Sequence, residues 1–483
     1  MRWLKYLCLL IGGTLLAGII FTVGWAGLKI ALDPQQDDAA HLLQKHKYLE
    51  QIQQLPARAD RPNIVFILFD DLGHGDLGFT GSQAIATPTM DQLAREGLVL
   101  TNFYSPAPVC TPARAGYLTG RLPLRAGMPN VVFPRWSLKG NASQLVDYNK
   151  RLPAEEITLA DVLQANGYAT GMVGKWHLGD RSPSLPNDMG FQSYFGALYS
   201  NDMEPFALYR DREIEIEAPA DQTRLNEWYG DAATDFIEQH SAAPFFLYFA
   251  HNFPHIPLFR PAQDEGRSRA GLYGDVIEGL DDVVARVVNT LRAEGVYDNT
   301  LILITSDNGP WYQGSAGTAR GRKADTFEGG MHVPMIVHWP AGLAGGRTLD
   351  GISMGIDWFP TILDWLNLPS PTDRIIDGKS LRAMLEDDAP SPNKYLFYFA
   401  GDSLMAVRDA QYKYHDKRSI AYVQPTMPVS FGPIKGPWLF DTHTDFNESY
   451  DVSMLLPEVT QRMQDVLDDK REEMIQNKRG WLE

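Results

Sequence analysis

Cysteine is almost absent from this chain, and so is any excess of positive charge. The 483 residues include only two cysteines, Cys8 and Cys110, which excludes the disulfide framework of small secreted domains. The 43 lysines and arginines are outnumbered by 60 aspartates and glutamates, giving a net charge of −17. A protein that follows nucleic-acid phosphates normally has the opposite balance, so we expect no nucleic-acid partner.

Long apolar runs are also scarce, with one exception near the N-terminus. Residues 6–28 carry no charge, and this stretch is longer than a signal-peptide core and long enough to cross a bilayer. Arg2 and Lys5 precede it and acidic residues follow, so the positive-inside rule keeps the N-terminus cytoplasmic. We expect residues 1–33 to be a transmembrane anchor with the folded part exported, most simply to a bacterial periplasm. A cleaved signal would instead make the protein secreted.

The remaining sequence predicts a polar connection and then a large α/β domain. Residues 34–60 are Gln-rich and indicate a short helix and a linker. Fully apolar runs such as 62–69, 244–250 and 300–306 have the length of buried strands, and they alternate with amphipathic helical patterns. This alternation predicts a mostly parallel sheet with helices on both faces, which we place in residues 61–390.

A second, smaller unit is predicted at the C-terminus. A stretch rich in Pro, Asp and Ser around residues 385–395 indicates a boundary. Short alternating apolar runs follow it, and a helical pattern begins near Pro457. We therefore expect residues 391–483 to form an antiparallel sheet with one helix.

Polar side chains follow four of the predicted strands. Ligands of open α/β sheets bind outside the carboxyl ends of the strands, so these residues are expected to share one site. Their aspartates and asparagines offer only oxygen ligands, which suit Ca²⁺ or Mg²⁺ better than zinc. Gly73 and Gly75 are expected to let the chain turn sharply after the first strand. The four sets are Asp70 and Asp71, Lys175 and His177, His251 and Asn252, and Asp307 and Asn308.

Cys110 does not fit such a site as an ordinary thiol. Three prolines surround it and a helical pattern follows, so it lies at or near a helix N-terminus, which favours an anion. A free cysteine is usually a small buried hydrophobe or, less often, a thiolate nucleophile. Soft sulfur is mismatched with a hard cation, and residue chemistry alone leaves this open.

The segments around these residues resemble the sulfatase family. Residues 110–114 (CTPAR) and 118–121 (LTGR) match its C-x-P-x-R…LTGR signature. Further segments resemble family blocks in the same order: FDDLGHGDLG, GKWHLG, PHIPL, TSDNGP, GRKADTFEGG and, near the C-terminus, LFDTHTDFNESYDV. The resemblance extends from Arg61 to about Gln464.

The resemblance implies an alkaline-phosphatase-like sandwich that hydrolyses sulfate monoesters of small molecules or saccharides. In the family, a formylglycine-generating enzyme oxidises the cysteine to formylglycine (3-oxoalanine), whose hydrate is an oxygen nucleophile and would remove the mismatch at Cys110. The residues that match the Ca²⁺ ligands, with Mg²⁺ as the alternative, are Asp70, Asp71, Asp307, Asn308 and the modified Cys110.

The same resemblance implies roles around the nucleophile. Arg114 matches the arginine that holds its hydroxyl, and His177 matches the histidine on the hydrate. Lys175 matches a lysine that contacts nucleophile and sulfate. On the substrate side, His255 matches the family's histidine, and Lys323 matches its lysine near the leaving oxygen. Ser200 matches the family's sulfate-contacting serine.

Several points stay open in the sequence. His332 stands where many relatives have an arginine, which affects loop packing or substrate detail. A phosphonate monoester or phosphodiester hydrolase of the same superfamily would share these motifs, and an unoxidised Cys110 would leave a non-catalytic, membrane-anchored binding protein. Residues 126–152 and 182–222 are expected to shape the substrate pocket without identifying the compound.

Overall fold

The computed structural model describes residues 35–56, 58, 60–145, 150–420 and 431–482. The predicted membrane anchor at residues 1–33 lies outside these ranges, as does Cys8. Among the helices that the structure describes, none is both long enough and apolar enough to cross a membrane.

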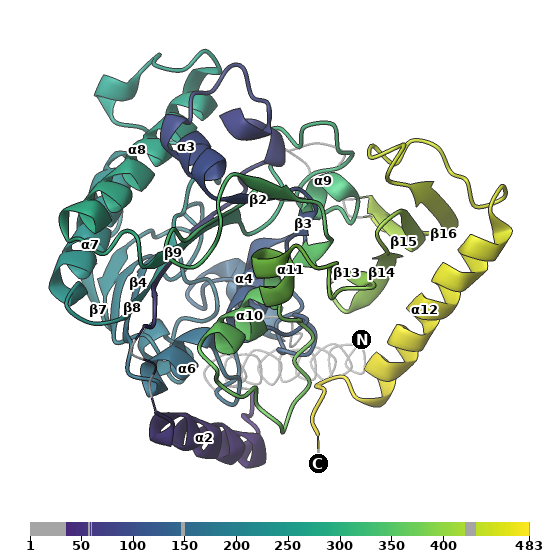
Figure 1. Cartoon of the computed structure of the whole chain (residues 1–483), viewed down its shortest axis with the longest axis horizontal. Coiled ribbons are helices and arrows are strands. Elements are labelled where there is room, and N and C mark those ends of the chain that lie inside the picture. Colours follow the sequence, from purple (N-terminus) through teal and green to yellow (C-terminus); the bar gives the residue numbers. More distant parts are fainter. Residues whose placement is uncertain (1–34, 57, 59, 146–149, 421–430, 483) are drawn as a thin grey trace, which may run out of the picture.

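A large mixed sheet forms the centre of the molecule (Figure 1). Its middle strands, from β9 to β5, run parallel, whereas β10 runs antiparallel to β9. This confirms the mostly parallel sheet that the apolar runs predict. The strand order is β11 (Arg347–Leu349), β2 (Leu98–Leu100), β10 (Met335–His338), β9 (Thr300–Ser306), β1 (Asn63–Phe69), β8 (Phe245–Ala250), β4 (Ala169–Gly174), β5 (Ser193–Gly196), β6 (Leu208–Arg210) and β7 (Glu213–Ile216).

Helices cover both faces of this sheet, as the continuous apolarity of its strands requires. Val65 and Ile67 of β1 face one layer, and Phe66 and Leu68 face the other. The first layer contains α3 (Pro88–Glu96), α7 (Leu225–His240) and α8 (Gly271–Ala293). The second contains α4 (Cys110–Thr119), α6 (Leu159–Ala165) and α10 (Trp358–Trp365). The result is the predicted sandwich.

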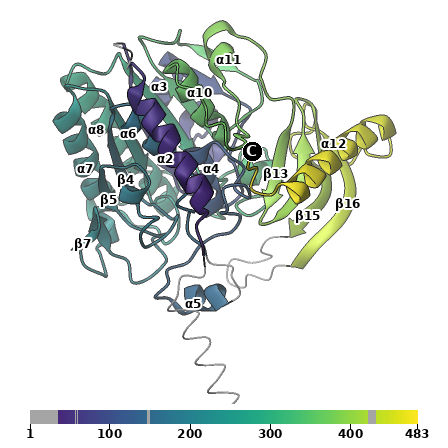
Figure 2. The ribbon, with the colours of Figure 1, turned by 90° about the horizontal axis from the view of Figure 1, so that it is seen from below.

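The Gln-rich segment before the sheet contains the predicted helix, α2 (Ala39–Gln54), which lies across the outside of the second layer (Figure 2). Its Tyr48 and Ile52 belong to the core of that layer. Buried Lys45 forms an ion pair of 2.8 Å with Asp161 of α6. These contacts attach α2 to the main domain.

The C-terminal part forms a four-stranded antiparallel sheet with one long helix, as predicted. The strands are β13 (Leu396–Ala400), β14 (Ser403–Arg408), β15 (Tyr412–Ile420) and β16 (Phe431–Asp441). Helix α12 (Pro457–Gln476) buries Met463, Leu467 and Met474 against them. The same core includes residues of β3 (Phe103–Tyr104) and β12 (Ser353–Met354), which belong to the main domain. The boundary at residue 390 stays a prediction.

Candidate active site

The carboxyl ends of four parallel strands carry the polar residues that the sequence singles out. Strand β1 lies between β8 and β9, and β4 is next to β8. Each of these strands is followed directly by one of the four polar sets. The eight residues of these sets are therefore brought to one edge of the sheet, and none is more than 2% exposed. The other predicted site residues contact this cluster from neighbouring segments: Cys110, Arg114, Ser200, His255 and Lys323.

The turn after β1 places two adjacent carboxylates in the same cluster. Asp71 has a positive φ of 66°, so its side chain does not point away from that of Asp70 as it would in a continued strand. Its carboxylate accepts a hydrogen bond of 2.7 Å from Asn308 Nδ2, and its backbone N–H donates to Asp307 Oδ1 at 3.2 Å. The bend therefore lies at Asp71 itself.

The expected role of Gly73 and Gly75 in this turn is different in the structure. Gly73 has an ordinary φ of −77°. A Cβ atom on Gly73 would lie 2.2 Å from Ser315 O, and one on Gly75 would lie 2.5 Å from Gly317 N. These glycines are required because two loops approach closely, which spacing along the sequence does not reveal.

Cys110 is the first residue of α4 and lies against the acidic cluster. Its Sγ and carboxylate oxygens of Asp70 and Asp307 all lie within 4.8 Å of one another. Burial raises the pKa of the Cys110 thiol, although Lys175 and Lys323 oppose this effect. The surroundings therefore disfavour the thiolate nucleophile that an unmodified cysteine would need.

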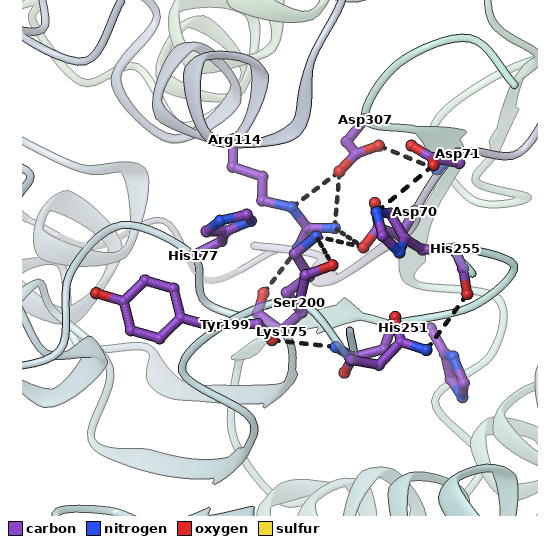
Figure 3. A network of polar contacts seen from close by, with 12 residues as sticks. Asp70, Asp71, Arg114, Lys175, His177, Tyr199, Ser200, His251, His255 and Asp307 are labelled. Carbon is purple, nitrogen blue, oxygen red and sulfur yellow. Dashed lines mark hydrogen bonds and ion pairs between the residues drawn. The ribbon is translucent and has the colours of Figure 1, made fainter. Parts of the chain in front are cut away.

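Positive charges surround these carboxylates (Figure 3). Buried Arg114 donates from Nε to Asp307 Oδ2 at 2.9 Å and from Nη1 to the Lys175 carbonyl at 2.7 Å. Lys175 pairs with Asp70 and donates to Ser200 Oγ at 3.1 Å. Because Arg114 and Lys175 each bind at least two other groups of this set, the side chains are positioned before any ligand arrives.

His177 is held by one ring nitrogen only. Its Nε2 donates to the Val132 carbonyl at 3.0 Å, whereas the buried Nδ1 has no hydrogen-bond partner among the described residues. Burial lowers the pKa of His177 well below its usual value, and Lys175 and Arg114 lower it further. The ring is therefore neutral at neutral pH, with a free lone pair on Nδ1.

His255 and Lys323 lie on the other side of the cluster, next to Asp71. Lys323 Nζ is 2.8 Å from Asp71 Oδ1 and 2.9 Å from Oδ2, and His255 Nε2 is 3.8 Å from Asp71 Oδ2. Asp71 raises the pKa of Lys323 in spite of its burial. His251 instead accepts a hydrogen bond from the backbone N–H of Phe253 at 2.9 Å and packs on Tyr229.

The donor set fits a hard divalent cation. Asp70 Oδ1 and Asn308 Oδ1 are buried and have no hydrogen-bond partner within the part of the chain that the structure describes, and unsatisfied buried oxygens are costly. Burial and the neighbouring Asp70 charge raise the pKa of Asp307 to about 7. A cation would remove both penalties, because it binds oxygens and offsets the mutual repulsion of the carboxylates.

His332, the departure from the family pattern, lies away from this cluster. Its Nε2 donates to the Thr101 carbonyl at 2.7 Å, and its ring stacks on His74 with centroids 4.2 Å apart. The substitution is thus accommodated by loop packing.

Sequence reasoning missed Ser306 and Tyr199. Ser306 Oγ accepts from Leu72 N at 2.9 Å and donates to the Asn308 carbonyl at 2.9 Å, so it joins the turns after β1 and β9. Tyr199 packs edge-to-face on His177 with centroids 5.7 Å apart. Each is next in sequence to a residue that a motif identifies, and this position is the only sequence signal that points to it.

The family model described as Sulfatase matches residues 62–368 of this chain. The chain belongs to the sulfatase family. A second model, N-sulphoglucosamine sulphohydrolase, C-terminal, matches residues 322–427. As a sulfatase, the protein is a sulfuric ester hydrolase that converts sulfate monoesters to alcohol and sulfate. Sulfatases generally use formylglycine and a divalent metal, and the acidic cluster here provides a place for such an ion.

Curated relatives and a solved structure agree with this assignment. N-acetylgalactosamine-6-sulfatase of Mus musculus is 37% identical over 378 residues, covering 73% of this chain and 72% of the relative. Arylsulfatase A of Homo sapiens is 34% identical over 457 residues, covering 84% of this chain and 87% of the relative. The crystal structure of the PsFucS1 sulfatase from Pseudoalteromonas sp. superposes with a TM-score of 0.77 at 26% identity. The match covers 92% of this chain and 95% of that structure.

Proposed function

We propose that this sulfatase acts through a formylglycine made from Cys110 and a Ca²⁺ ion, with Mg²⁺ as the alternative. Asp70, Asp71, Asp307 and Asn308 would hold the ion together with the modified residue 110. The observation that carries the proposal is the position of Cys110 Sγ within 4.8 Å of the Asp70 and Asp307 carboxylates. The hydrated aldehyde would supply two hydroxyl groups on one carbon. One would attack sulfur, and the other would allow sulfate to be released without an attacking water. The cation would lower the pKa of these hydroxyl groups.

The cationic side chains would bind and orient the ester. Lys175 and Ser200, which are 3.1 Å apart, are placed to contact sulfate oxygens. Lys323 keeps its proton because Asp71 raises its pKa, so it can donate a hydrogen bond to the leaving oxygen. His255, beside Asp71, would contact the ester from the same side.

Two further groups would manage the protons at residue 110. Arg114 holds Asp307 through a hydrogen bond of 2.9 Å, which keeps that carboxylate in place to accept the proton of the attacking hydroxyl. His177 carries its hydrogen on Nε2, where Val132 accepts it, so Nδ1 is available as the base for the second hydroxyl.

The relatives suggest a saccharide substrate. Several of them are named N-acetylgalactosamine-6-sulfatase, and we propose that this chain acts on the sulfate ester of a sugar. We further propose that residues 1–33 anchor the enzyme in the membrane, with the folded part exported to a bacterial periplasm. A formylglycine-generating enzyme would modify Cys110. The catalytic domain would comprise residues 61–390 and the C-terminal subdomain residues 391–483.

The test uses the full chain co-expressed with a formylglycine-generating enzyme. The tryptic peptide of residues 96–114 should lose its sulfur and gain an aldehyde, as measured by mass spectrometry. The enzyme should hydrolyse 4-nitrophenyl sulfate faster than 4-nitrophenyl phosphate or a 4-nitrophenyl phosphonate ester. Cys110→Ala should abolish turnover, whereas Cys8→Ala, at the other cysteine of the chain, should keep the wild-type rate.

Three outcomes would contradict the proposal. Repeated turnover by Cys110→Ala would exclude residue 110 as the nucleophile. Faster cleavage of the phosphonate would favour the other hydrolase of the superfamily. An unmodified peptide together with sulfate-ester binding but no turnover would indicate the non-catalytic binding protein.

A further inference from the structure

The loop of residues 131–137, which leads into helix α5 (Leu138–Leu145), presents an exposed tryptophan beside the site. Trp136 is 45% exposed, although most large apolar side chains near this edge of the sheet are buried. Its ring packs edge-to-face on Tyr199, with centroids 5.6 Å apart and an interplanar angle of 84°. Tyr199 in turn packs on the His177 ring at 5.7 Å. Two aromatic contacts thus connect an exposed indole to a catalytic-site histidine.

The loop is tied to the site by its backbone. The Val132 carbonyl accepts the His177 hydrogen bond of 3.0 Å, and Val132 N donates to Thr111 Oγ1 at 3.3 Å, next to Cys110. Arg135 N donates to Asp180 Oδ2 at 3.1 Å, and the Arg135 guanidinium lies 3.4 Å from the same carboxylate. These contacts fix the backbone of the loop that carries Trp136 relative to the nucleophile.

The surroundings of Trp136 favour an anionic saccharide over a small ester alone. Arg135 is paired with Asp180, whereas Lys139, in the first turn of α5, places its ammonium 4.0 Å above the Phe133 ring. Lys139 lies three residues from Trp136, and in a chain with a net charge of −17 its ammonium would attract a sulfated saccharide. An aromatic ring beside a few polar groups is a common lining of ligand sites.

We propose that Trp136 is a specificity-determining residue that stacks against a sugar ring of the substrate. Figure 3 shows Tyr199 and His177 on one side of the cluster and His255 on the other, so a ring stacked on Trp136 extends the substrate toward the Tyr199 side. Indole provides a large, rigid apolar surface for such a contact. The proposal rests on the saccharide sulfatase activity proposed above.

The experiment compares Trp136→Ala, Trp136→Phe and Leu138→Ala in the formylglycine-containing enzyme. Leu138, the first residue of α5, is 88% exposed and lies two residues from Trp136, so it is the matched control. The substrates are a chondroitin 6-sulfate disaccharide and 4-nitrophenyl sulfate, and inhibition by inorganic sulfate reports on the anion site alone. Circular dichroism and thermal unfolding check that each variant is folded.

Trp136→Ala should raise KM for the disaccharide about tenfold, the upper end of what an aromatic contact contributes. Its kcat, its KM for 4-nitrophenyl sulfate and its inhibition by sulfate should stay at wild-type values. Trp136→Phe should recover most of the loss, and Leu138→Ala should show none. A purely structural role would change all substrates together.

An unchanged disaccharide KM in Trp136→Ala, or an equal change in Leu138→Ala, would overturn the role of Trp136 while leaving the sulfatase proposal intact. If the wild-type enzyme cleaves 4-nitrophenyl sulfate but not the disaccharide, the stacking role is overturned for this class of saccharide. A wild-type enzyme that cleaves neither compound would overturn the proposed function, and this inference with it.

Discussion

Replacing Lys413 by methionine should destabilise the protein strongly, because Lys413 lies between two buried carboxylates. Its Nζ is 2.8 Å from Glu328 Oε1 and 3.3 Å from Glu448 Oε1, and all three side chains are fully buried. Glu328 belongs to α9 (Glu328–Met331) of the main domain, whereas Lys413 is in β15 of the C-terminal sheet. The ion pair therefore connects the two parts of the molecule.

The expected loss is about 3–5 kcal/mol in the free energy of unfolding, because removing one partner leaves buried charge uncompensated. Arg408, 3.0 Å from Glu328, and His415, 2.7 Å from Glu448, remain as neighbours and keep the loss within that range. Urea unfolding followed by fluorescence measures it. Lys478→Met is the control: Lys478 is 54% exposed and 3.7 Å from Asp402, so its loss should be at most about 1 kcal/mol.

The same substitution should shift the acid sensitivity of the protein. Burial raises the pKa of Glu328, but Lys413 and Arg408 outweigh it and hold the value at about 2. Because this lies below the ordinary glutamate value, the stabilisation by the Glu328 carboxylate is complete above about pH 4.5 and is lost as the pH falls toward 2. Without Lys413 the folded-state pKa rises, so acid unfolding should begin at a higher pH.

Two results would refute this reasoning. The first is a loss in Lys413→Met no larger than in Lys478→Met. The second is a double variant, Glu328→Gln with Lys413→Met, that recovers no stability relative to Lys413→Met alone, since removing the uncompensated charge should restore part of the loss.

Metal removal and a glycine pair provide further tests. Dialysis against EDTA should abolish sulfate-ester turnover and lower the melting temperature, with Ca²⁺ restoring both, because the ion stabilises the folded state that binds it; full activity in EDTA would contradict the metal site. Gly174→Ala should lower the free energy of unfolding, measured in urea, several-fold more than Gly81→Ala. Both glycines have a positive φ, of 105° and 108°, but a Cβ on Gly174 would lie 2.0 Å from Ala250 O, whereas nothing lies within 4 Å of one on Gly81. Equal losses would show that backbone conformation alone, and not crowding, decides the cost.

Much of the fold could be predicted because its signals are local. Apolar runs such as 62–69 and 300–306 had the length of strands buried on both faces, and these became β1 and β9. The C-terminal helix begins at Pro457, as its pattern predicts. Cys110 lies at a helix N-terminus because its prolines and the following helical pattern specify that position.

Other features depended on contacts between distant segments. The positive φ of Asp71 has no sequence signature, and Gly73 is required by the loop at Ser315, far along the chain. The meeting of Glu328 with Lys413 involves residues 85 positions apart, which no periodicity links. The same applies to Trp136, whose neighbour Tyr199 belongs to another loop.

The order of strands and helices, the polar residues at the strand ends and the family were therefore determined by the sequence by itself, since each rests on short-range patterns or a contiguous motif. Only the tertiary structure decided which carboxylate oxygens converge near Cys110, which charges compensate one another and which aromatic ring stays exposed beside the site. These depend on distances between parts of the chain that become neighbours only when the sheet is assembled.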